Sequence, residues 1–493
     1  GEIRKNLIEN NHIDAIIGLP ANIFFGTGIP TIIMVLRQKR ENTDVLIIDA
    51  SKGFIKEGKN NKLRASDIKR IADTFIKRES VPKFSRVVSR EEIRSNDYNL
   101  NIPRYVDSSE AAEHWDVYAS MFGGIPTAEI EELGEFWTAF PALKKALFTE
   151  SGIPYVNVSV DDIKSAIKSH PDVVGFEDAF NAAFSTFPAF LKEELIDRME
   201  SIEISKAETV LSADIFERLK DIPLIDKYAA FQLLDDDWTG ISIDLEVLQT
   251  EGFSATKEVD PNLVIKKKDG KDQEVQEGWV GHIIPFDLVQ ATLLSAETDE
   301  LHGLESRLAE IPSEYESILD EMTEEDKESC NDVLTEEGDA FVPKEVSKKI
   351  KELKKDRSPE SVALRTLLEK VESLVKSEKE IKAEIKAKSA ALQAKTKDTI
   401  ERLSDEQALD LLEKKWIAPL IESIHKLPDT VIDSLVSKIQ ALQNKYATTF
   451  FEVEQQISET EATLSGMIDD LEGNEYDMLG LNELKKLLGG SAE

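Results

Sequence analysis

Two adjacent phenylalanines, Phe24 and Phe25, are the residues of this sequence best suited to binding chemistry. They lie in the stretch IIGLPANIFFGTGIPT (16–31), in a glycine-containing loop between two apolar runs. An aromatic ring on such a loop offers a flat face on which a planar group, such as a flipped nucleic-acid base, can stack. The simpler interpretation is that both rings plug the edge of a sheet, and composition alone favours it.

The usual catalytic constellations are absent from the sequence. It has no Gly-x-Ser-x-Gly elbow, no His-Glu-x-x-His pair and no phosphate-binding P-loop. Gly26-Thr27-Gly28 precedes a strand-like run instead of joining a strand to a helix, which favours a simple turn. The acidic run at 235–237 is interpreted as a solvated loop, not a metal site. We therefore predict no catalytic residue, no cofactor-binding residue and no metal ligand in this chain.

The 493-residue chain is acidic, with a formal net charge of -36, but the charge is unevenly distributed. Residues 1–110 hold 19 Lys and Arg against 15 Asp and Glu, whereas the remainder holds 41 against 81. Only the first segment has a balance compatible with contact to phosphates. The remainder resembles a solvated scaffold or a surface for a basic protein partner.

The single cysteine, Cys330, excludes an intrachain disulfide and fits a reducing cytoplasm. No apolar run has the length of a membrane span, so no membrane contact is predicted. The chain opens directly on the helical pattern GEIRKNLIENN, from which we expect a piece of a longer protein.

Hydrophobic periodicity predicts an α/β segment first. A helix over 2–11 is followed by a short strand over 12–19 and by strands over 31–36 and 45–49. The last two are continuous apolar, β-branched runs, which are typical of buried strands. An amphipathic helix over 66–78 comes next, with Ser66 as its N-cap. Its buried face is predicted to consist of Ile68, Ile71, Ala72 and Phe75.

The rest of the chain is predicted to be mainly helical. Phenylalanines recur every three or four residues in 176–190, a spacing far more typical of core than of a ligand site. Residues 240–285 have strand-like composition, with an Asp269-Gly270 turn that predicts a small β hairpin. The predicted domains are 1–110, 111–330 with this insertion, and a long-helix, coiled-coil-like assembly region over 331–493.

Two heptad seams mark the last region. They are formed by Leu367, Val371, Leu374, Ile381, Ile385 and Leu392, and by Val431, Leu435, Ile439, Leu442, Tyr446, Phe450, Val453, Ile457, Leu464, Ile468 and Leu471. The pattern is equally compatible with intrachain core and with contact to another chain.

Four blocks in order resemble the modification subunits of type I restriction–modification systems. They are IIGLPANIFFGTGIPTIIMVLRQ (16–38), DVLIIDASKGF (44–54), NKLRASDIKRIADTF (61–75) and NDYNLNIPRYV (96–106). The first is similar to the segment that follows the catalytic Asn-Pro-Pro-Phe motif of that family, so the resemblance is to its C-terminal part. The block from Tyr98 to Tyr105 matches without a physical role that we can assign.

The resemblance implies that residues 1–50 are the last strands of a Rossmann-like methyltransferase sheet. It implies methyl transfer from S-adenosylmethionine to N6 of adenine in duplex DNA, by an enzyme that assembles with a specificity subunit, a second modification subunit and restriction subunits. Neither the Asn-Pro-Pro-Phe motif nor the glycine-rich cofactor loop occurs here, so this piece alone is expected to be inactive. By position, Phe24 best matches the aromatic residue that packs on the target adenine, with Phe25 beside it.

Two other functions stay open. The chain could be a non-catalytic, acidic helical scaffold or interaction protein, which a longer reading frame carrying the missing motifs would exclude. It could also derive from an orphan or phage-defence adenine methyltransferase, which a neighbouring specificity-subunit gene would exclude. For the helical half, the family implies contact with the coiled-coil helices of the specificity subunit.

Overall fold

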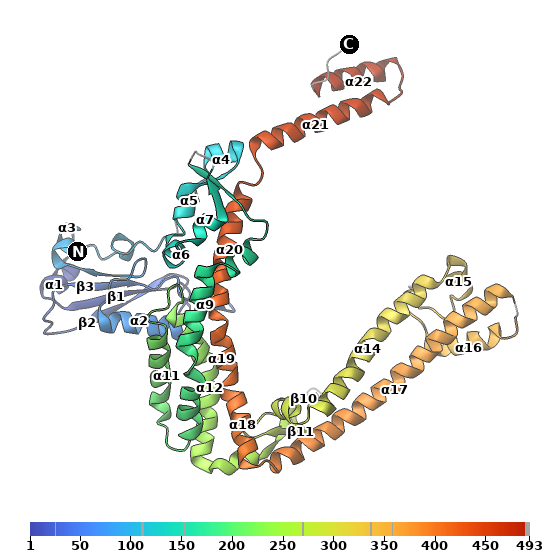
Figure 1. Cartoon of the computed structure of the whole chain (residues 1–493), viewed down its shortest axis with the longest axis horizontal. Coiled ribbons are helices and arrows are strands. Elements are labelled where there is room, and N and C mark those ends of the chain that lie inside the picture. The colour runs from blue at the N-terminus through green and yellow to red at the C-terminus, as the bar shows by residue number, and fades with distance from the viewer. Residues whose placement is uncertain are drawn as a thin grey trace. The chain divides into compact units, whose positions relative to one another are not determined.

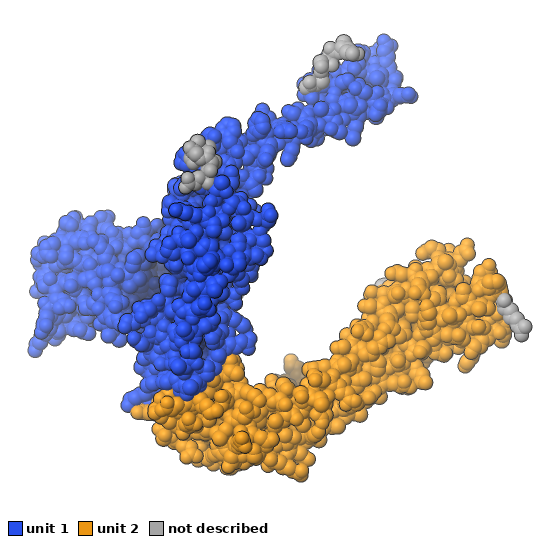
Figure 2. Space-filling model, in the orientation of Figure 1, with its two compact units in different colours: residues 1–190, 205–239, 420–493 blue, residues 191–204, 240–419 orange. Residues whose placement is uncertain are grey.

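The computed structural model describes residues 1–24, 26–109, 113–150, 154–268, 271–335, 338–356 and 358–488. The chain forms two compact units (Figure 2). The first comprises residues 1–190, 205–239 and 420–493, and the second comprises residues 191–204 and 240–419. Phe25 and the predicted turn at Asp269-Gly270 lie outside the described residues.

The first unit begins with a four-stranded mixed sheet flanked by helices (Figure 1). Its strand order is β2-β1-β3-β6, with β1 parallel to β3 and antiparallel to β2, and β3 antiparallel to β6. The elements of this region are α1 (Glu2–Glu9), β1 (Ile13–Leu19), β2 (Thr31–Leu36), β3 (Val45–Asp49), β4 (Ile55–Glu57), β5 (Asn60–Lys62), α2 (Ala65–Lys77), β6 (Ser85–Val88), α3 (Arg90–Ser95) and the 3-10 helix η1 (Ile102–Arg104).

Every residue of β1 and β3 is buried, because both faces of the sheet are covered. On one face Ile16 and Ile47 pack in a cluster with residues of α1 and α3. On the other, Ile17 and Ile48 pack in a cluster that includes Phe75 of α2. Burial on both faces removes the usual apolar–polar alternation, and the prediction that 45–49 is a buried strand is confirmed. The strand predicted at 12–19 also forms, as β1.

The prediction that 31–36 is also buried is wrong. Ile32, Ile33 and Leu36 of β2 are exposed, because β2 is the edge strand of the four-stranded sheet. An apolar run predicts a strand, but it does not distinguish a covered strand from an uncovered one.

The helix predicted over 66–78 forms as α2, but its cap and buried face differ from the prediction. The N-cap is Arg64, whose backbone N–H donates to Oδ2 of Asp67 at 3.0 Å. Ser66 lies inside the helix, and its N–H donates to the side chain of Gln232 at 3.0 Å. Ile68 is exposed, as is Ala72, whereas Ile71 and Phe75 pack toward the sheet as predicted.

A buried ion cluster ties four points of this region together. The carboxylate of Asp14, near the start of β1, pairs with Nε of Arg40 at 3.0 Å and with a guanidinium N–H of Arg78 at 2.7 Å. Arg40 also donates to the carbonyl of Asp44 at 2.5 Å, and Arg78 pairs with the Asp44 carboxylate. The cluster therefore fixes the start of β1, the residues after β2, the approach to β3 and the end of α2.

The rest of the first unit is mainly helical, as predicted, with a small sheet that was not. Phe176, Phe180, Phe184 and Phe187 are all buried, which confirms the predicted core stripe. The three-stranded sheet, order β7-β9-β8, forms from β7 (Ile125–Pro126), β8 (Phe148–Glu150) and β9 (Tyr155–Val158). The helices that lie wholly or mostly in this unit are α4 (Val117–Phe122), α5 (Thr127–Glu131), α6 (Gly134–Ala139), α7 (Leu143–Leu147), α8 (Ile163–Lys168), α9 (Pro171–Phe184), α10 (Phe187–Leu191), α11 (Ile204–Arg218), α19 (Ala418–His425), α20 (Leu427–Lys445), α21 (Phe450–Asp469) and α22 (Glu475–Leu487). Helix α12 (Lys227–Glu251) belongs to this unit up to Thr239 and to the second unit from Gly240.

Two predictions are wrong for residues that form helix α12. The acidic run at 235–237, predicted as a solvated loop, lies within this helix, and burial raises the pKa values of Asp235 and Asp237. Residues 240–251, predicted as strand-like, are helical as well. The unfavourable helix propensity of aspartate is small, so packing of the surrounding apolar residues overrides it.

The second unit contains the predicted hairpin, formed by β10 (Val259–Lys268) and β11 (Lys271–Gly281) with Val264 opposite Val275. Helices α14 and α17 run beside one another as long arms (Figure 1). Val371 and Leu374 of the first seam are buried there, in a core shared with α14 and α16, so this part of the seam is intrachain core. The remaining elements are η2 (Lys192–Asp197), η3 (Phe253–Lys257), α13 (Phe286–Thr292), α14 (Ser295–Glu321), α15 (Glu324–Ser329), α16 (Pro343–Leu353), α17 (Pro359–Glu401) and α18 (Asp405–Trp416).

The second heptad seam is buried in α20 and mostly exposed in α21. Val431, Leu435 and Ile439 of α20 are buried in the core of the first unit. From Phe450 onward the seam is mostly exposed, as are apolar side chains of α22. In the described part of the chain, no helix is both long and apolar enough to cross a lipid bilayer.

We predict that Asp14→Asn weakens the sheet by about 3 kcal/mol, because it removes the buried carboxylate that pairs with the buried Arg40 at 3.0 Å and with Arg78 at 2.7 Å. Hydrogen exchange of the β1 and β3 amides measures this loss as faster local opening. Glu57→Gln removes the exposed ion pair with Lys62 and is the matched control, with an expected change within about 0.5 kcal/mol. Equal exchange rates in the two variants would contradict the role assigned to the cluster.

Candidate functional site

The loop that carries Phe24 lies at the carboxyl edge of the parallel strands. Because β1 and β3 are parallel and Gly18 pairs with Asp49, the segments that follow the two strands leave the sheet at the same edge. The backbone N–H of Ala50 donates to the Gly18 carbonyl at 2.9 Å, which joins the two exits. Such an edge is where open α/β sheets place their ligands.

The loop turns Phe24 outward. Ile23 packs against the buried strands, whereas the next residue, Phe24, is 53% exposed. Asn22 and Gly26 have positive φ angles of 55° and 81°, and the N–H of Thr27 donates to the Phe24 carbonyl at 3.3 Å. Phe24 therefore offers an accessible ring and does not plug the sheet edge.

A short hairpin, β4–β5, holds this loop in place. The backbone N–H of Asn61 donates to the Asn22 carbonyl at 3.0 Å, and its side-chain amide donates to the Ala21 carbonyl at 2.7 Å. Sequence reasoning missed Asn61, because a hydrogen bond to a backbone 40 residues away leaves no local pattern. Its two bonds make the hairpin and the Phe24 loop neighbours.

The residues present do not fit S-adenosylmethionine. Gly26-Thr27-Gly28 lies between the Phe24 turn and β2, so it is not the strand-to-helix loop that cradles a nucleotide-like cofactor. Among the residues that the structure describes, no group of three or more His, Cys, Asp or Glu side chains could hold a metal ion. At this edge, the described residues supply a stacking face and no strand-to-helix glycine loop of the kind that cradles a cofactor.

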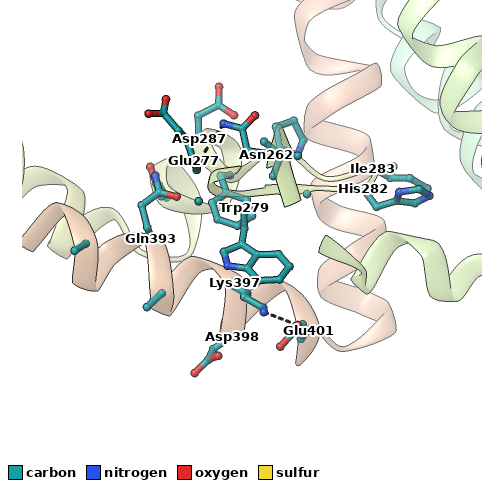
Figure 3. Close-up of a pocket in the computed structure, with 18 of the residues that line it drawn as sticks. Asn262, Glu277, Trp279, His282, Ile283, Asp287, Gln393, Lys397, Asp398 and Glu401 are labelled. Carbon is teal, nitrogen blue, oxygen red and sulfur yellow. Dashed lines mark hydrogen bonds and ion pairs between the residues drawn. The ribbon is translucent and has the colours of Figure 1, made fainter. Parts of the chain in front are cut away.

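A cavity of about 1150 Å³ lies in the second unit, between the β10–β11 hairpin and α17 (Figure 3). Nζ of Lys397 lies 3.4 Å from the ring centre of Trp279 and also pairs with Glu401 at 3.8 Å. The ring of His282 bonds to Asp260 at 2.6 Å, and this hydrogen bond raises the pKa of His282. The Lys397–Trp279 contact joins the hairpin to α17, a structural role that the sequence did not indicate for Trp279.

Comparison with known proteins bears on the segment that holds Phe24. Residues 1–114 match the family model described as N-6 DNA methylase. The N-terminal region is therefore similar to the N-6 DNA methylase family. We call residues 1–114 the methylase region.

Relatives of the methylase region are subunits of type I restriction enzymes. The chain is 39% identical over 116 residues to the type I restriction enzyme MpnII methylase subunit of Mycoplasma pneumoniae, covering 23% of this chain and 21% of the relative. It is 37% identical over 142 residues to the MjaVII methylase subunit of Methanocaldococcus jannaschii, covering 27% and 25%. The chain thus spans about a quarter or less of the length of these relatives.

A solved structure is similar over the same share of the chain. It is the methyltransferase subunit of a type I restriction–modification system from Streptococcus thermophilus. The identity is 51%, with 22% of this chain and 23% of that chain covered and a TM-score of 0.22.

The block from Tyr98 to Tyr105 closes the methylase region. The Tyr98 hydroxyl donates to Oε1 of Glu9 at 2.7 Å, and the Arg94 guanidinium donates to both carboxylate oxygens of Glu9 at 2.8 and 2.6 Å. Tyr105 is buried, and its hydroxyl donates to the Asn99 carbonyl at 2.5 Å. The structure therefore gives the block a physical role, which is to join α3 and the following loop to the end of α1.

The hydrogen bonds from Arg94 and Tyr98 hold the pKa of Glu9 at about 2, below its ordinary 4.5. A depressed carboxylate pKa stabilises the fold above pH 4.5, and this contribution is lost as the pH falls toward 2. The thermal midpoint of Glu9→Gln should therefore lie below that of the wild type at pH 6, and the gap should close between pH 4.5 and 2.

Glu2→Gln changes the charge of the same helix by the same amount and is the matched control. A Glu9→Gln deficit that stays constant from pH 6 to pH 2 would contradict this assignment.

Proposed function

We propose that this chain is the C-terminal part of a type I modification subunit, which in its intact form transfers a methyl group from S-adenosylmethionine to N6 of adenine in duplex DNA. The observation that carries the proposal is the exposed Phe24 ring, at the carboxyl edge of the sheet within the methylase region. In this proposal Phe24, with Phe25 beside it, forms one wall of the pocket for the flipped adenine. The residues that bind the cofactor and the amino group belong to the rest of the intact enzyme.

The uncovered edge strand supports the idea that these are the last strands of a larger Rossmann-like sheet. Ile32, Ile33 and Leu36 leave apolar side chains of β2 in solvent, which is unfavourable for an isolated sheet. Further structure of the intact subunit against β2 would bury them. The absence of the Asn-Pro-Pro-Phe motif from the chain is consistent with the same idea.

Within the intact, assembled enzyme, Phe24→Ala should lower methylation and base flipping about tenfold or more, because base–aromatic stacking contributes roughly 1–3 kcal/mol. Flipping is measured by the fluorescence of 2-aminopurine at the target position. Ile29→Ala removes another exposed apolar side chain from the same loop and should leave both readouts unchanged. Unchanged flipping and methylation in Phe24→Ala would refute the role of this ring.

We further propose that α21 and α22 form the contact with the coiled-coil helices of the specificity subunit, in an assembly that also holds a second modification subunit and restriction subunits. Phe450, Ile457, Leu464 and Met467 expose an apolar stripe along α21, as helices that dock on other helices do. In this account the methylase part of the chain is 1–110. The mainly helical domain is 111–330, and the assembly region is 331–493.

Removal of residues 450–493 should abolish co-purification with the specificity subunit while leaving the thermal midpoint of the remaining chain nearly unchanged, because α21 is mostly exposed. A deletion that began near residue 430 would remove the buried Val431 and Leu435 and disturb the core. Ile457→Asp with Leu464→Asp tests the same surface without truncation. Retention of the specificity subunit by both variants would count against this surface.

The acidic helical half also favours a second candidate, a non-catalytic scaffold for a basic partner. Residues 111–493 carry 41 Lys and Arg against 81 Asp and Glu. A scaffold of this kind would tolerate Phe24→Ala in every assay, whereas a methyltransferase subunit would not.

A further inference from the structure

The β4–β5 hairpin is an electrostatic exception in this chain. Residues 51–64 hold five Lys and Arg and one acidic residue, Glu57, in a protein whose formal net charge is -36. Lys56, Lys59 and Lys62 are exposed. A concentration of exposed lysines in an acidic protein points to an anionic partner at this position.

The strand register determines which lysines lie near the Phe24 loop. Lys56 is directly opposite Asn61, so the two side chains lie on the same face of the hairpin. That face is the one from which Asn61 bonds to the Ala21 carbonyl. Lys59 lies at the tip, after Gly58 with its φ of +63°.

The other basic groups are already paired. Lys62, one position along from Asn61, points to the opposite face and pairs with Glu57 at 3.1 Å. The Arg64 guanidinium donates twice to Asp67, at 2.9 and 3.0 Å. Within the ranges that the structure describes, Lys56 and Lys59 have no carboxylate partner, so their charges are available to a ligand.

We infer that Lys56 and Lys59 bind the phosphate backbone of duplex DNA beside the target base. The inference rests on the proposed function and assigns a further part of the same site. Lysine ammonium groups on a hairpin tip act as point charges that recognise phosphates without reading sequence. Phe24 and these lysines are held together by Asn61, so the backbone contact would set the register of the strand whose base is flipped.

The test is the salt dependence of duplex binding by the full chain. Fluorescence anisotropy with a labelled 20-base-pair duplex gives the slope of log Kobs against log salt between 50 and 200 mM. Each phosphate contact to B-DNA contributes about 0.9 to that slope. Lys56→Gln with Lys59→Gln should therefore reduce its magnitude by about 1.8 and weaken binding at every sequence alike.

Two controls have matched charge changes. Lys376→Gln with Lys379→Gln neutralises two exposed lysines of α17 and should leave the slope unchanged. Lys62→Gln neutralises the paired lysine on the opposite face and should have less effect than either Lys56→Gln or Lys59→Gln.

An unchanged slope in the Lys56/Lys59 variant overturns the inference, as does equal displacement of the duplex by polyglutamate at the same charge concentration. In the assembled enzyme, intact 2-aminopurine flipping in that variant together with an unchanged slope would reject the hairpin contact and leave the methyltransferase proposal standing. Absence of flipping in the wild type would instead reject the proposed function.

Discussion

The buried carboxylate of Asp14 imposes the constraint on which the N-terminal sheet depends. A charge inside a packed sheet is tolerated only when its partners are held in place, so Arg40 and Arg78 must lie where the chain brings them together. This requirement fixes the approach to β1 and β3 at one end of the sheet. Their carboxyl ends are then aligned at the other end, and the Phe24 loop and the β4–β5 hairpin leave the sheet there as neighbours.

The same arrangement separates two kinds of surface. The carboxyl edge carries an exposed ring and unpaired lysines, a combination suited to a base and its phosphates. The helical remainder is acidic, a balance that suits a basic protein partner better than nucleic acid. In the proposed function the first surface faces DNA and the second faces protein, as in a subunit that modifies DNA while another subunit reads the sequence.

Sequence patterns predicted where helices and strands form better than they predicted the burial and the long-range contacts of those elements. The run at β3 was recognised as a buried strand because burial on both faces leaves a continuous apolar signature, whereas Asp14 interrupts that signature in the equally buried β1. The equally apolar β2 is exposed, since its position at the sheet edge depends on pairing that the local sequence does not encode. Phe24 could be selected from its residue type and its place in a loop. Its outward direction, however, follows from the inward packing of Ile23. The hydrogen bond from Asn61 to this loop joins residues 40 positions apart, which no local pattern reveals. Arg64 was missed as an N-cap because arginine has no side-chain oxygen to accept from the helix N–H groups, and here the Asp67 carboxylate accepts from the Arg64 N–H instead.

The central proposal is that this chain contributes the target-base wall of a methyltransferase but not its cofactor cradle. Isothermal titration of the purified chain with S-adenosylmethionine tests it most directly. The account predicts no saturable heat of binding, because the only Gly-x-Gly of the sequence forms a turn ahead of β2. Stoichiometric binding by this chain alone would contradict it.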